Sequence, residues 1–318
     1  MAEETLVAPI VEVKNLTKRF GDTAVLRGIN LSVMRGTVLG VLGPNGAGKT
    51  TAINCLTTLL VPDSGEATIA GYDVVRQPEA VRSLIGLTGQ FAAVDEVLTA
   101  RENLVLFGRL LRLSGKAAKQ RADELLTRFD LTAAANRPVK TFSGGMRRRL
   151  DLAASIIVLP LVLFLDEPTT GLDPRSRQQL WAVVQGLKAQ GITIILTTQY
   201  LEEADALADQ IVVIDQGQVI AEGTADELKD KVGGKFCELR LANLADTEKV
   251  KHLLGDLGDL IVEEDGGALA IAAPNGAKTL TEIVLRLESA SIPLADISLR
   301  RPSLDDVFFA LTGHTTHT

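Results

Sequence analysis

This 318-residue chain has few aromatic residues, few cysteines and no excess of basic residues. Each of these features argues against a class of function. Only 4% of the residues are aromatic, which argues against a stacking platform for single-stranded nucleic acid. The formal net charge of -7 argues against a protein that binds DNA or RNA unaided. Two cysteines, Cys55 and Cys237, make no disulfide framework and fit a reducing compartment.

Long apolar runs are also missing. The longest, LAASIIVLPLVLFLDE, is broken by Pro160, ends in carboxylates and is too short to span a bilayer. The first residues, MAEETLVAPI, lack a basic start and an extended apolar stretch, so we expect no signal peptide. We therefore expect a soluble chain that meets a membrane only through a partner. The hydrophobic content of 46% is enough for a large core, and the length favours two domains.

The pattern of residues 10–230 is typical of an α/β domain. Alternating apolar runs at 10–16 and 24–33 predict antiparallel strands. Between residues 99 and 157, apolar residues recur at three- and four-residue spacing, which predicts an inserted helical subdomain. Buried strands that alternate with helices indicate a mainly parallel core sheet. Further strands are expected at 66–74, 84–89, 161–167, 193–198 and 210–217.

A lysine-rich segment with two glycines, residues 229–236, predicts a domain boundary. We place the first domain at 10–230 and the second at 235–313. The second domain has the order β-α-β-β-α-β followed by a helix, which predicts a small α+β unit of the ferredoxin-like type. It has no evident catalytic cluster, so we expect an accessory role in regulation, docking or dimerisation. The last residues, 313–318, are expected to be disordered.

The stretch GPNGAGKT, residues 43–50, fits the phosphate-binding pattern G-x-x-x-x-G-K-[ST] between a buried strand and a helix. Its glycines let backbone N–H groups close around phosphates at a helix N-terminus. Lys49 is expected to reach the β- and γ-phosphates, and the Thr50 hydroxyl to bind Mg²⁺. A glycine turn with a surface lysine would not need that flanking strand and helix. The predicted nucleotide-binding residues are Gly43, Pro44, Asn45, Gly46, Ala47, Gly48, Lys49, Thr50 and Thr51.

A second motif, LVLFLDEP at 161–168, puts Asp166 and Glu167 at the end of a buried strand. Adjacent carboxylates there are costly unless a cation or a substrate uses them. We predict that Asp166 holds Mg²⁺, directly or through water, and that Glu167 is the general base for the attacking water. A solvated strand end is the alternative, and the nearby phosphate loop weakens it.

A third motif, FSGGMRRRL at 142–150, predicts a second anion site. Ser143 is a good N-cap, and Gly144 and Gly145 expose N–H groups at a helix start. One chain needs only one anion site to hold one γ-phosphate. When two chains pack head to tail, the second anion site of each chain can face the nucleotide of the other chain. We therefore expect a homodimer in which Ser143, Gly144 and Gly145 face the second copy's nucleotide. The arginine run 147–149 is interpreted as a solvated face of the helix.

Together, GPNGAGKT, LTGQ, FSGGMRRRL, LVLFLDEP and GLDPRSR resemble the ATP-binding cassette superfamily in order and spacing. The resemblance covers roughly residues 10–224 and implies a P-loop NTPase with a RecA-like core, an antiparallel β subdomain and a helical subdomain. It implies that ATP is the ligand, that Gln90 touches its Mg²⁺ and reports to a membrane partner, and that Asp173 lies at a dimer seam. Phe20 resembles the aromatic residue that stacks on adenine, although a core phenylalanine at a strand end is the alternative.

A narrower likeness continues to the end of the chain. GYDVV, TGQFAAVDE, LTTQYLEEADALAD and RRPSLDDVFFALTG are similar to the daunorubicin/doxorubicin-resistance ATP-binding subunits of actinobacterial exporters. The similarity implies a separate integral-membrane permease, a position on the cytoplasmic face of an actinobacterial cell membrane, and export of a hydrophobic drug or a complex lipid. Residues 91–113 are our candidate for the permease contact.

Gln199 departs from the superfamily and agrees with the narrower family. Most members have a switch histidine there, and the three histidines of this chain, His252, His314 and His317, lie outside the cassette. Glutamine can donate to a phosphate oxygen and accept from water, but it cannot carry a proton at neutral pH. We expect Gln199 to position water while Glu167 remains the catalytic base. The alternatives are a slow, switch-like cassette and a non-transport ATPase of the same superfamily.

Overall fold

The computed structural model describes residues 8–90, 92–232, 235–258, 260–262, 268–300 and 303–312. The chain divides between Ala225 and Asp226 into two compact units, which are described separately. The tail 313–318 and Phe91 lie outside the described residues, so the expectations for them stay predictions. Every helix within the described ranges falls short of the length and apolar character that crossing a bilayer requires.

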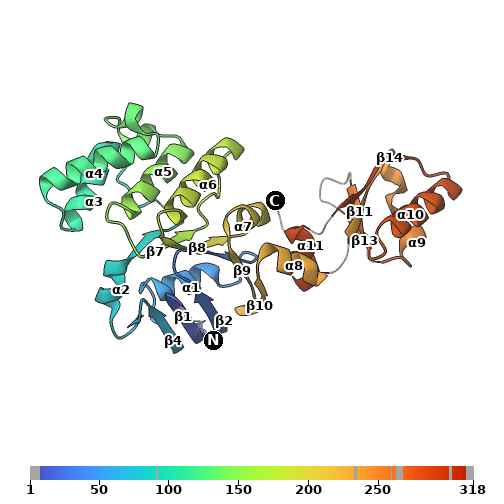
Figure 1. Cartoon of the computed structure of the whole chain (residues 1–318), viewed down its shortest axis with the longest axis horizontal. Coiled ribbons are helices and arrows are strands. Elements are labelled where there is room, and N and C mark those ends of the chain that lie inside the picture. Colours follow the sequence, from blue (N-terminus) through green and yellow to red (C-terminus); the bar gives the residue numbers. More distant parts are fainter. Residues whose placement is uncertain are drawn as a thin grey trace, which may run out of the picture. The chain divides into compact units, whose positions relative to one another are not determined.

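A six-stranded sheet forms the centre of the first unit (Figure 1). Its order is β10-β9-β3-β8-β7-β6, with β9 to β6 parallel and only β10 antiparallel, which confirms the predicted parallel core. Strands β3, β7 and β8 are buried along their whole length. The strands are β3 (Val38–Leu42), β6 (Ile85–Thr88), β7 (Val162–Asp166), β8 (Thr193–Thr198), β9 (Gln210–Asp215) and β10 (Gln218–Gly223).

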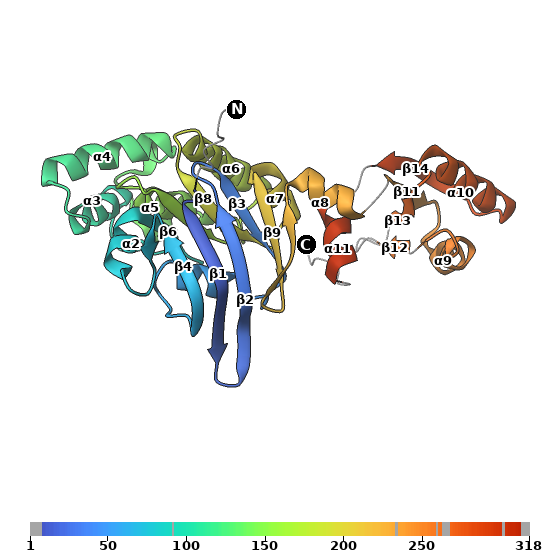
Figure 2. The same ribbon diagram turned by 60° about the horizontal axis from the view of Figure 1, so that its bottom comes forward.

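A second sheet of the first unit is antiparallel, as the alternating apolar runs predict. Its order is β2-β1-β4-β5, and Figure 2 shows the long β1–β2 hairpin with β4 beside β1. Alternate residues of β1 face the core, which fits a strand with one solvated side. The strands are β1 (Val11–Phe20), β2 (Thr23–Val33), β4 (Ser64–Ile69) and β5 (Tyr72–Asp73).

Helices fill the chain between β6 and β7, which confirms the predicted helical subdomain. Thr99 begins the first of them with a reciprocal capping box to Glu102, and Ser114 caps the next. Their buried faces meet around Leu104, Leu125 and Phe129. The helices of the first unit are α1 (Lys49–Leu56), α2 (Pro78–Leu84), α3 (Ala100–Leu110), α4 (Gly115–Arg128), α5 (Gly144–Ser155), α6 (Pro174–Lys188) and α7 (Leu201–Leu207).

The second unit has the ferredoxin-like order β12-β13-β11-β14 with antiparallel neighbours. Residues of α9 and α10 pack with the sheet in one core that contains Cys237, Val250 and Ile283. Our predicted ranges, 10–230 and 235–313, differ from the structural division mainly in the assignment of α8. The elements are α8 (Ala225–Val232), β11 (Lys235–Leu241), α9 (Thr247–Leu254), β12 (Leu260–Val262), β13 (Ala268–Ala273), α10 (Ala277–Ser289), β14 (Leu294–Arg300) and α11 (Leu304–Thr312).

Candidate nucleotide site

The loop 43–50 joins β3 to α1, so the backbone N–H groups of the first helical turn open into it. None of its three glycines can be replaced without strain, as Gly43 and Gly48 illustrate. A Cβ on Gly43 would lie 2.2 Å from the carbonyl oxygen of Ile214. Gly48 has φ +106, and its Cβ would lie 2.9 Å from Leu26 Cδ2. The glycine pattern therefore specifies a tight loop that packs against neighbouring strands and leads directly into the start of α1.

Lys49 is buried inside this loop. Its Nζ donates to the carbonyl oxygens of Gly43 at 2.8 Å and Pro44 at 3.1 Å, and it lies 3.4 Å from Glu167 Oε1. Burial lowers the pKa of Lys49, and the Glu167 carboxylate opposes that shift. An ammonium group is thus held on the loop carbonyls, where a phosphate could take their place as its partner.

The Asp166 carboxylate accepts hydrogen bonds from two hydroxyl groups at the carboxyl end of the parallel sheet. Its Oδ1 accepts from Thr197 Oγ1 at 2.6 Å and from Thr50 Oγ1 at 3.1 Å. Gln90 Nε2 donates to the same Thr50 hydroxyl at 3.3 Å. Thr50, Gln90 and Asp166 are the predicted metal-binding residues, and the structure brings them together from α1, the loop after β6 and the end of β7.

These oxygens suit a hard cation such as Mg²⁺, because a hydroxyl, a carboxylate and an amide converge. Turning the Gln90 amide over would present its oxygen instead of its nitrogen. The described residues contain no group of three or more histidine, cysteine, aspartate or glutamate side chains placed to hold a metal. A cation here would therefore complete its coordination with phosphate oxygens and water, as Mg²⁺ commonly does.

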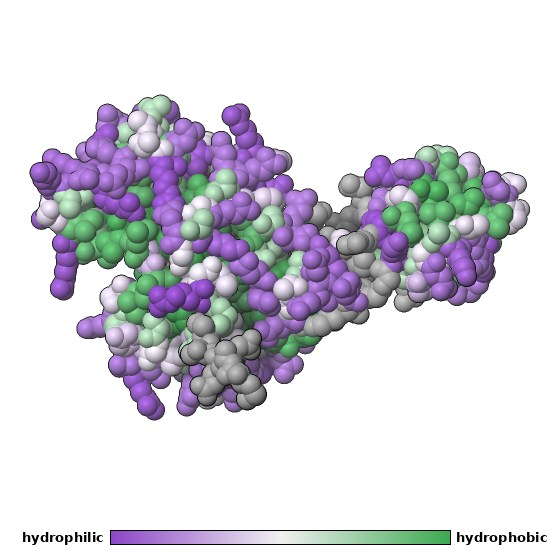
Figure 3. All heavy atoms as spheres, in the orientation of Figure 1, coloured by the Kyte–Doolittle hydropathy of each residue, from purple (hydrophilic) through white to green (hydrophobic). Residues whose placement is uncertain are grey.

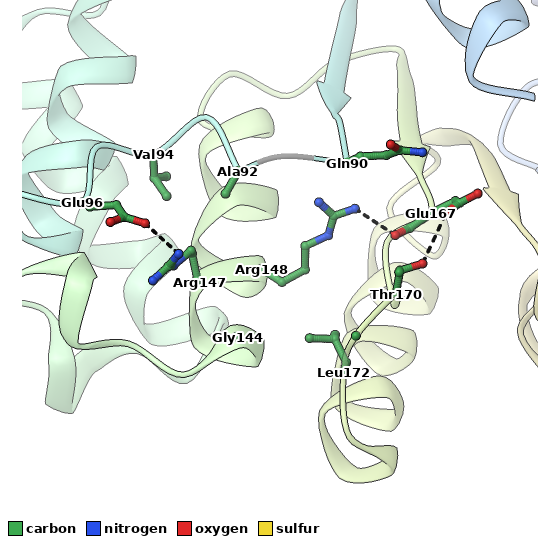
Figure 4. A pocket seen from close by; sticks show the side chains of 11 residues that line it. Gln90, Ala92, Val94, Glu96, Gly144, Arg147, Arg148, Glu167, Thr170 and Leu172 are labelled. Carbon is green, nitrogen blue, oxygen red and sulfur yellow. Dashed lines mark hydrogen bonds and ion pairs between the residues drawn. The ribbon is translucent and has the colours of Figure 1, made fainter. Parts of the chain in front are cut away.

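Glu167 lies beside the loop lysine with a constrained backbone. Its N–H points at Thr197, 3.0 Å from Oγ1 and 3.1 Å from the carbonyl oxygen, and its φ is +46, which is unusual for a residue with a Cβ. Thr170 Oγ1 donates to Glu167 Oε2 at 3.4 Å. The carboxylate thus lies between an ammonium group and a hydroxyl, and it also lines an open cavity of about 600 Å³ with Gln90 and Gly144 (Figure 4).

Ser143 begins α5 as predicted, because its side chain accepts from the N–H of Met146 at 3.2 Å. Ser143 and Gly144 are exposed, whereas Gly145 packs against the start of α6. Asp173 caps α6 by accepting from the N–H and the hydroxyl of Ser176, and these hydrogen bonds lower the pKa of Asp173. Two capped helix starts therefore lie close together.

Phe20 is exposed at the end of a strand, and Gln199 is half-buried just after another. Phe20 ends β1 with 49% of its surface exposed, so it is not a core phenylalanine. Lys18 Nζ lies 5.7 Å from the centroid of its ring. Gln199 is half-buried directly after β8, whose last residue, Thr198, accepts from the N–H of Tyr200 at 2.9 Å.

Comparison with known proteins identifies the family. Residues 26–170 match the model described as ABC transporter, and residues 223–312 match the model described as ATP-binding protein DrrA1-3-like, C-terminal domain. Daunorubicin resistance ATP-binding protein DrrA2 of Streptomyces coeruleorubidus is 55% identical over 96% of each chain. Doxorubicin resistance ATP-binding protein DrrA of Mycobacterium tuberculosis (strain CDC 1551 / Oshkosh) is 51% identical over 96% of this chain and 94% of its own. The chain belongs to this family of ABC transporter ATPases.

A solved structure supports the cassette fold. The dimeric post-hydrolysis state of an ATP-binding cassette bound to ADP and Pi has a TM-score of 0.62 and 27% identity, and the match covers 67% of this chain and 98% of that one. The fold class, the superfamily and the narrower family that the motifs indicate are therefore confirmed.

The interpretation of the arginine run is wrong for one residue of this ABC ATPase. Arg148 is only 9% exposed and donates to backbone carbonyl oxygens instead of facing solvent. Its neighbours behave differently: Arg147 pairs with Glu96 at 2.7 Å at the surface, and Arg149 donates to Gln179. Helical register explains the difference, because Arg148 follows buried Gly145 by three residues and so lies on the inner face of α5.

Sequence reasoning also missed residues that support the site. Thr197 bridges Asp166 and Glu167, and Asp151 is a buried carboxylate on α5.

Glu203 on α7 is fully buried, with Oε1 accepting from Trp181 Nε1 at 3.2 Å. Burial raises the pKa of Glu203, and the hydroxyls of Thr198 and Thr169 and the Trp181 N–H oppose the rise. For Asp151 and Glu203, the available sequence signal was a charged residue at a helix position where the spacing predicts a buried apolar one.

Proposed function

We propose that this ATPase binds MgATP at the carboxyl edge of its parallel sheet and drives export of a hydrophobic drug or a complex lipid through a separate permease. The observation that carries the proposal is the convergence of Lys49, Thr50, Asp166 and Glu167 beside the loop 43–50. Catalysis of phosphoryl transfer needs positioning and charge stabilisation more than covalent chemistry, and this arrangement offers both.

Each residue takes a role that its surroundings support. Lys49 exchanges its loop carbonyls for β- and γ-phosphate oxygens, while the N–H groups at the start of α1 bind the phosphates. Glu167 accepts the proton of the attacking water. Thr50, Asp166 and Gln90 would hold Mg²⁺, which would neutralise phosphate charge when bound. Phe20, exposed at the end of β1, stacks on the adenine.

Gln199 positions the attacking water and senses the γ-phosphate. It follows β8 directly, and the neighbouring β7 carries Asp166 to the same sheet edge. Its amide offers both a donor and an acceptor, which suffices to orient water when Glu167 supplies the base. Hydrolysis then does not require a histidine at this position.

The working state is a homodimer in which Ser143, Gly144 and Gly145 of each copy face the nucleotide of the other. Ser143 and Gly144 are exposed at the start of α5, a 12-residue helix whose N-terminus attracts anions. A structurally similar cassette forms a dimer bound to ADP and Pi. An isologous pair of this kind completes two sites with one sequence.

The permease contact lies on the described part of our candidate segment, residues 92–113. Leu106 and Leu110 of α3 are exposed, and so are Leu111 just after this helix and Val97 in the loop before it. Figure 3 shows apolar surface over this helical region. Exposed leucines that cluster on one helix mark an interaction surface. Docking there would place the chain on the cytoplasmic face of the membrane, next to the loop that carries Gln90.

Steady-state phosphate release by the purified full-length chain tests the hydrolytic part of the proposal. Wild type should hydrolyse MgATP, and Glu167→Gln should bind ATP but lose about 100-fold or more in kcat. In analytical ultracentrifugation, Glu167→Gln with ATP should accumulate as a dimer. Retained turnover in Glu167→Gln would remove Glu167 as the base.

Doxorubicin retention in cells that carry the chain with its membrane subunit tests export, and unchanged retention would restrict the proposal to hydrolysis.

A further inference from the structure

We propose that Arg148 and Asp151 of α5 are positioning residues that hold the Gln90 loop and the catalytic carboxylate segment in one fixed arrangement. The inference rests on the proposed function, because it assigns these residues a part in hydrolysis. Both side chains are almost completely buried, three residues apart on α5, with Arg148 Nη1 3.7 Å from Asp151 Oδ2.

Arg148 binds backbone from two separate segments. Its Nε donates to Pro168 O at 2.9 Å, and its Nη2 donates to Asp166 O at 3.0 Å and Glu167 O at 3.3 Å. Its Nη1 donates to Gly89 O at 2.5 Å. The planar guanidinium can serve several acceptors in different directions, whereas an ammonium group cannot reproduce this geometry. One side chain therefore joins the end of β7 to the residue just before Gln90.

Asp151 binds the other end of the same loop. Its Oδ1 accepts from the N–H of Ala93 at 2.8 Å. Gly89 and Ala93 are therefore both attached to α5, one through Arg148 and the other through Asp151, and Gln90 lies between them. Figure 4 shows Arg148 extending from α5 toward Glu167, and Gln90 among the side chains that line the same cavity.

Arg148 and Asp151 lie on the helix that also begins the proposed contact with the second copy. The same helix begins with Ser143 and Gly144, which we propose to face the second copy's nucleotide. A shift of α5 would carry Arg148 and Asp151 with it and so move the attachments of Gln90 and Glu167 together. Arg148 and Asp151 thus couple the position of the start of α5 to the positions of Gln90 and Glu167. Contiguous hydrogen-bonded networks couple two sites in this way.

Arg148→Lys is the main variant, since it keeps a positive charge beside Asp151 but cannot serve four carbonyls. We expect kcat for MgATP to fall about tenfold or more, because small misplacements of reacting groups have large effects on rate. The Kd for a fluorescent ATP analogue should change by less than about threefold, since the loop 43–50 is untouched. Amide hydrogen exchange of the peptide containing Ala93 should speed up about tenfold or more without nucleotide.

Arg121→Met is the matched control. Arg121 of α4 also donates to backbone carbonyls, those of Ile156 and Ile157 at the far end of α5, but it touches none of the site residues. It should lower the melting temperature while leaving kcat and Ala93 exchange unchanged. Asp151→Leu, which removes the acceptor for the Ala93 N–H, gives a second route if Arg148→Lys folds poorly, and it should speed Ala93 exchange in the same way.

The outcomes separate this inference from the proposed function. Absence of hydrolysis by wild type would remove the proposed function, and the exchange measurement would then decide the positioning role alone. Wild-type exchange and kcat in Arg148→Lys would overturn the inference. A kcat loss in Arg121→Met equal to that of Arg148→Lys would also overturn it, because general destabilisation would then account for both.

Discussion

Thr197 Oγ1 donates a 2.6 Å hydrogen bond to Asp166 Oδ1 from the neighbouring parallel strand. The same oxygen lies 3.0 Å from the N–H of Glu167 and can accept from it. The Thr197 hydroxyl therefore orients the Asp166 carboxylate, which we assign to Mg²⁺. It also orients the backbone of Glu167, which we assign as the base.

Thr197→Val should reduce the rate much more than the affinity for ATP. The substitution keeps the shape but leaves both Asp166 and the Glu167 N–H without this partner, so kcat should fall about 10- to 100-fold. The free energy of unfolding should fall by about 1–3 kcal/mol, because buried polar groups lose hydrogen bonds. Kinetics and chemical denaturation measure the two effects. Thr197→Ser, which keeps the hydroxyl, is the control, and a Val variant as active as the Ser variant would contradict the assignment.

Variants of Gln199 should distinguish water positioning from a surface role. Gln199→Ala removes donor and acceptor and should lower kcat about 10- to 100-fold. Gln199→His should keep activity and add an inflection to the pH–rate profile near pH 6.5, the ordinary histidine pKa, which wild type lacks because glutamine does not titrate. An Ala variant with wild-type kcat would show that Gln199 does not act on the water.

Lys49→Met should abolish ATP binding without weakening the fold. Burial lowers the pKa of Lys49, so the folded chain binds this proton less tightly than the unfolded chain does. Wild-type stability should therefore rise as pH approaches about 10.4, the ordinary lysine pKa, and this rise should be missing in the variant. At neutral pH the variant should melt at the same or a higher temperature. A marked loss of stability would show that the ammonium group stabilises the loop.

Glu203→Gln should stabilise the chain at neutral pH. Burial raises the pKa of Glu203, so the folded state holds a proton that the unfolded state loses, and stability falls as pH rises above about 4.3. The variant should lack this fall, and its advantage over wild type should shrink toward acid pH. Trp181, the only tryptophan and the hydrogen-bond donor to Glu203, provides the fluorescence signal for unfolding. An advantage that grows toward acid pH would contradict the sign.

The nucleotide loop could be predicted from sequence because its information is local. Gly43 and Gly48 are required by backbone contacts and φ, and the flanking strand and helix have clear apolar patterns. Such a motif specifies its own conformation before any tertiary contact is known.

The supporting residues could not be predicted in the same way, since their roles depend on long-range register. Thr197 acts on Asp166 only because β8 lies beside β7 with these residues paired. Arg148 is surrounded in sequence by arginines that are partly exposed, and only the helical phase set by Gly145 and the buried apolar residues of α5 separates it from them.

The backbone of Glu167 has a consequence for how this chain can vary. A left-handed φ of +46 suits glycine or asparagine better than glutamate, for which it costs about 1–3 kcal/mol. Selection for folding alone would therefore favour replacing the glutamate, while the chemistry requires its carboxylate. Substitutions that raise thermal stability and lower ATPase activity should therefore be found first at position 167. There, the residue that is best for folding differs from the residue that is needed for turnover.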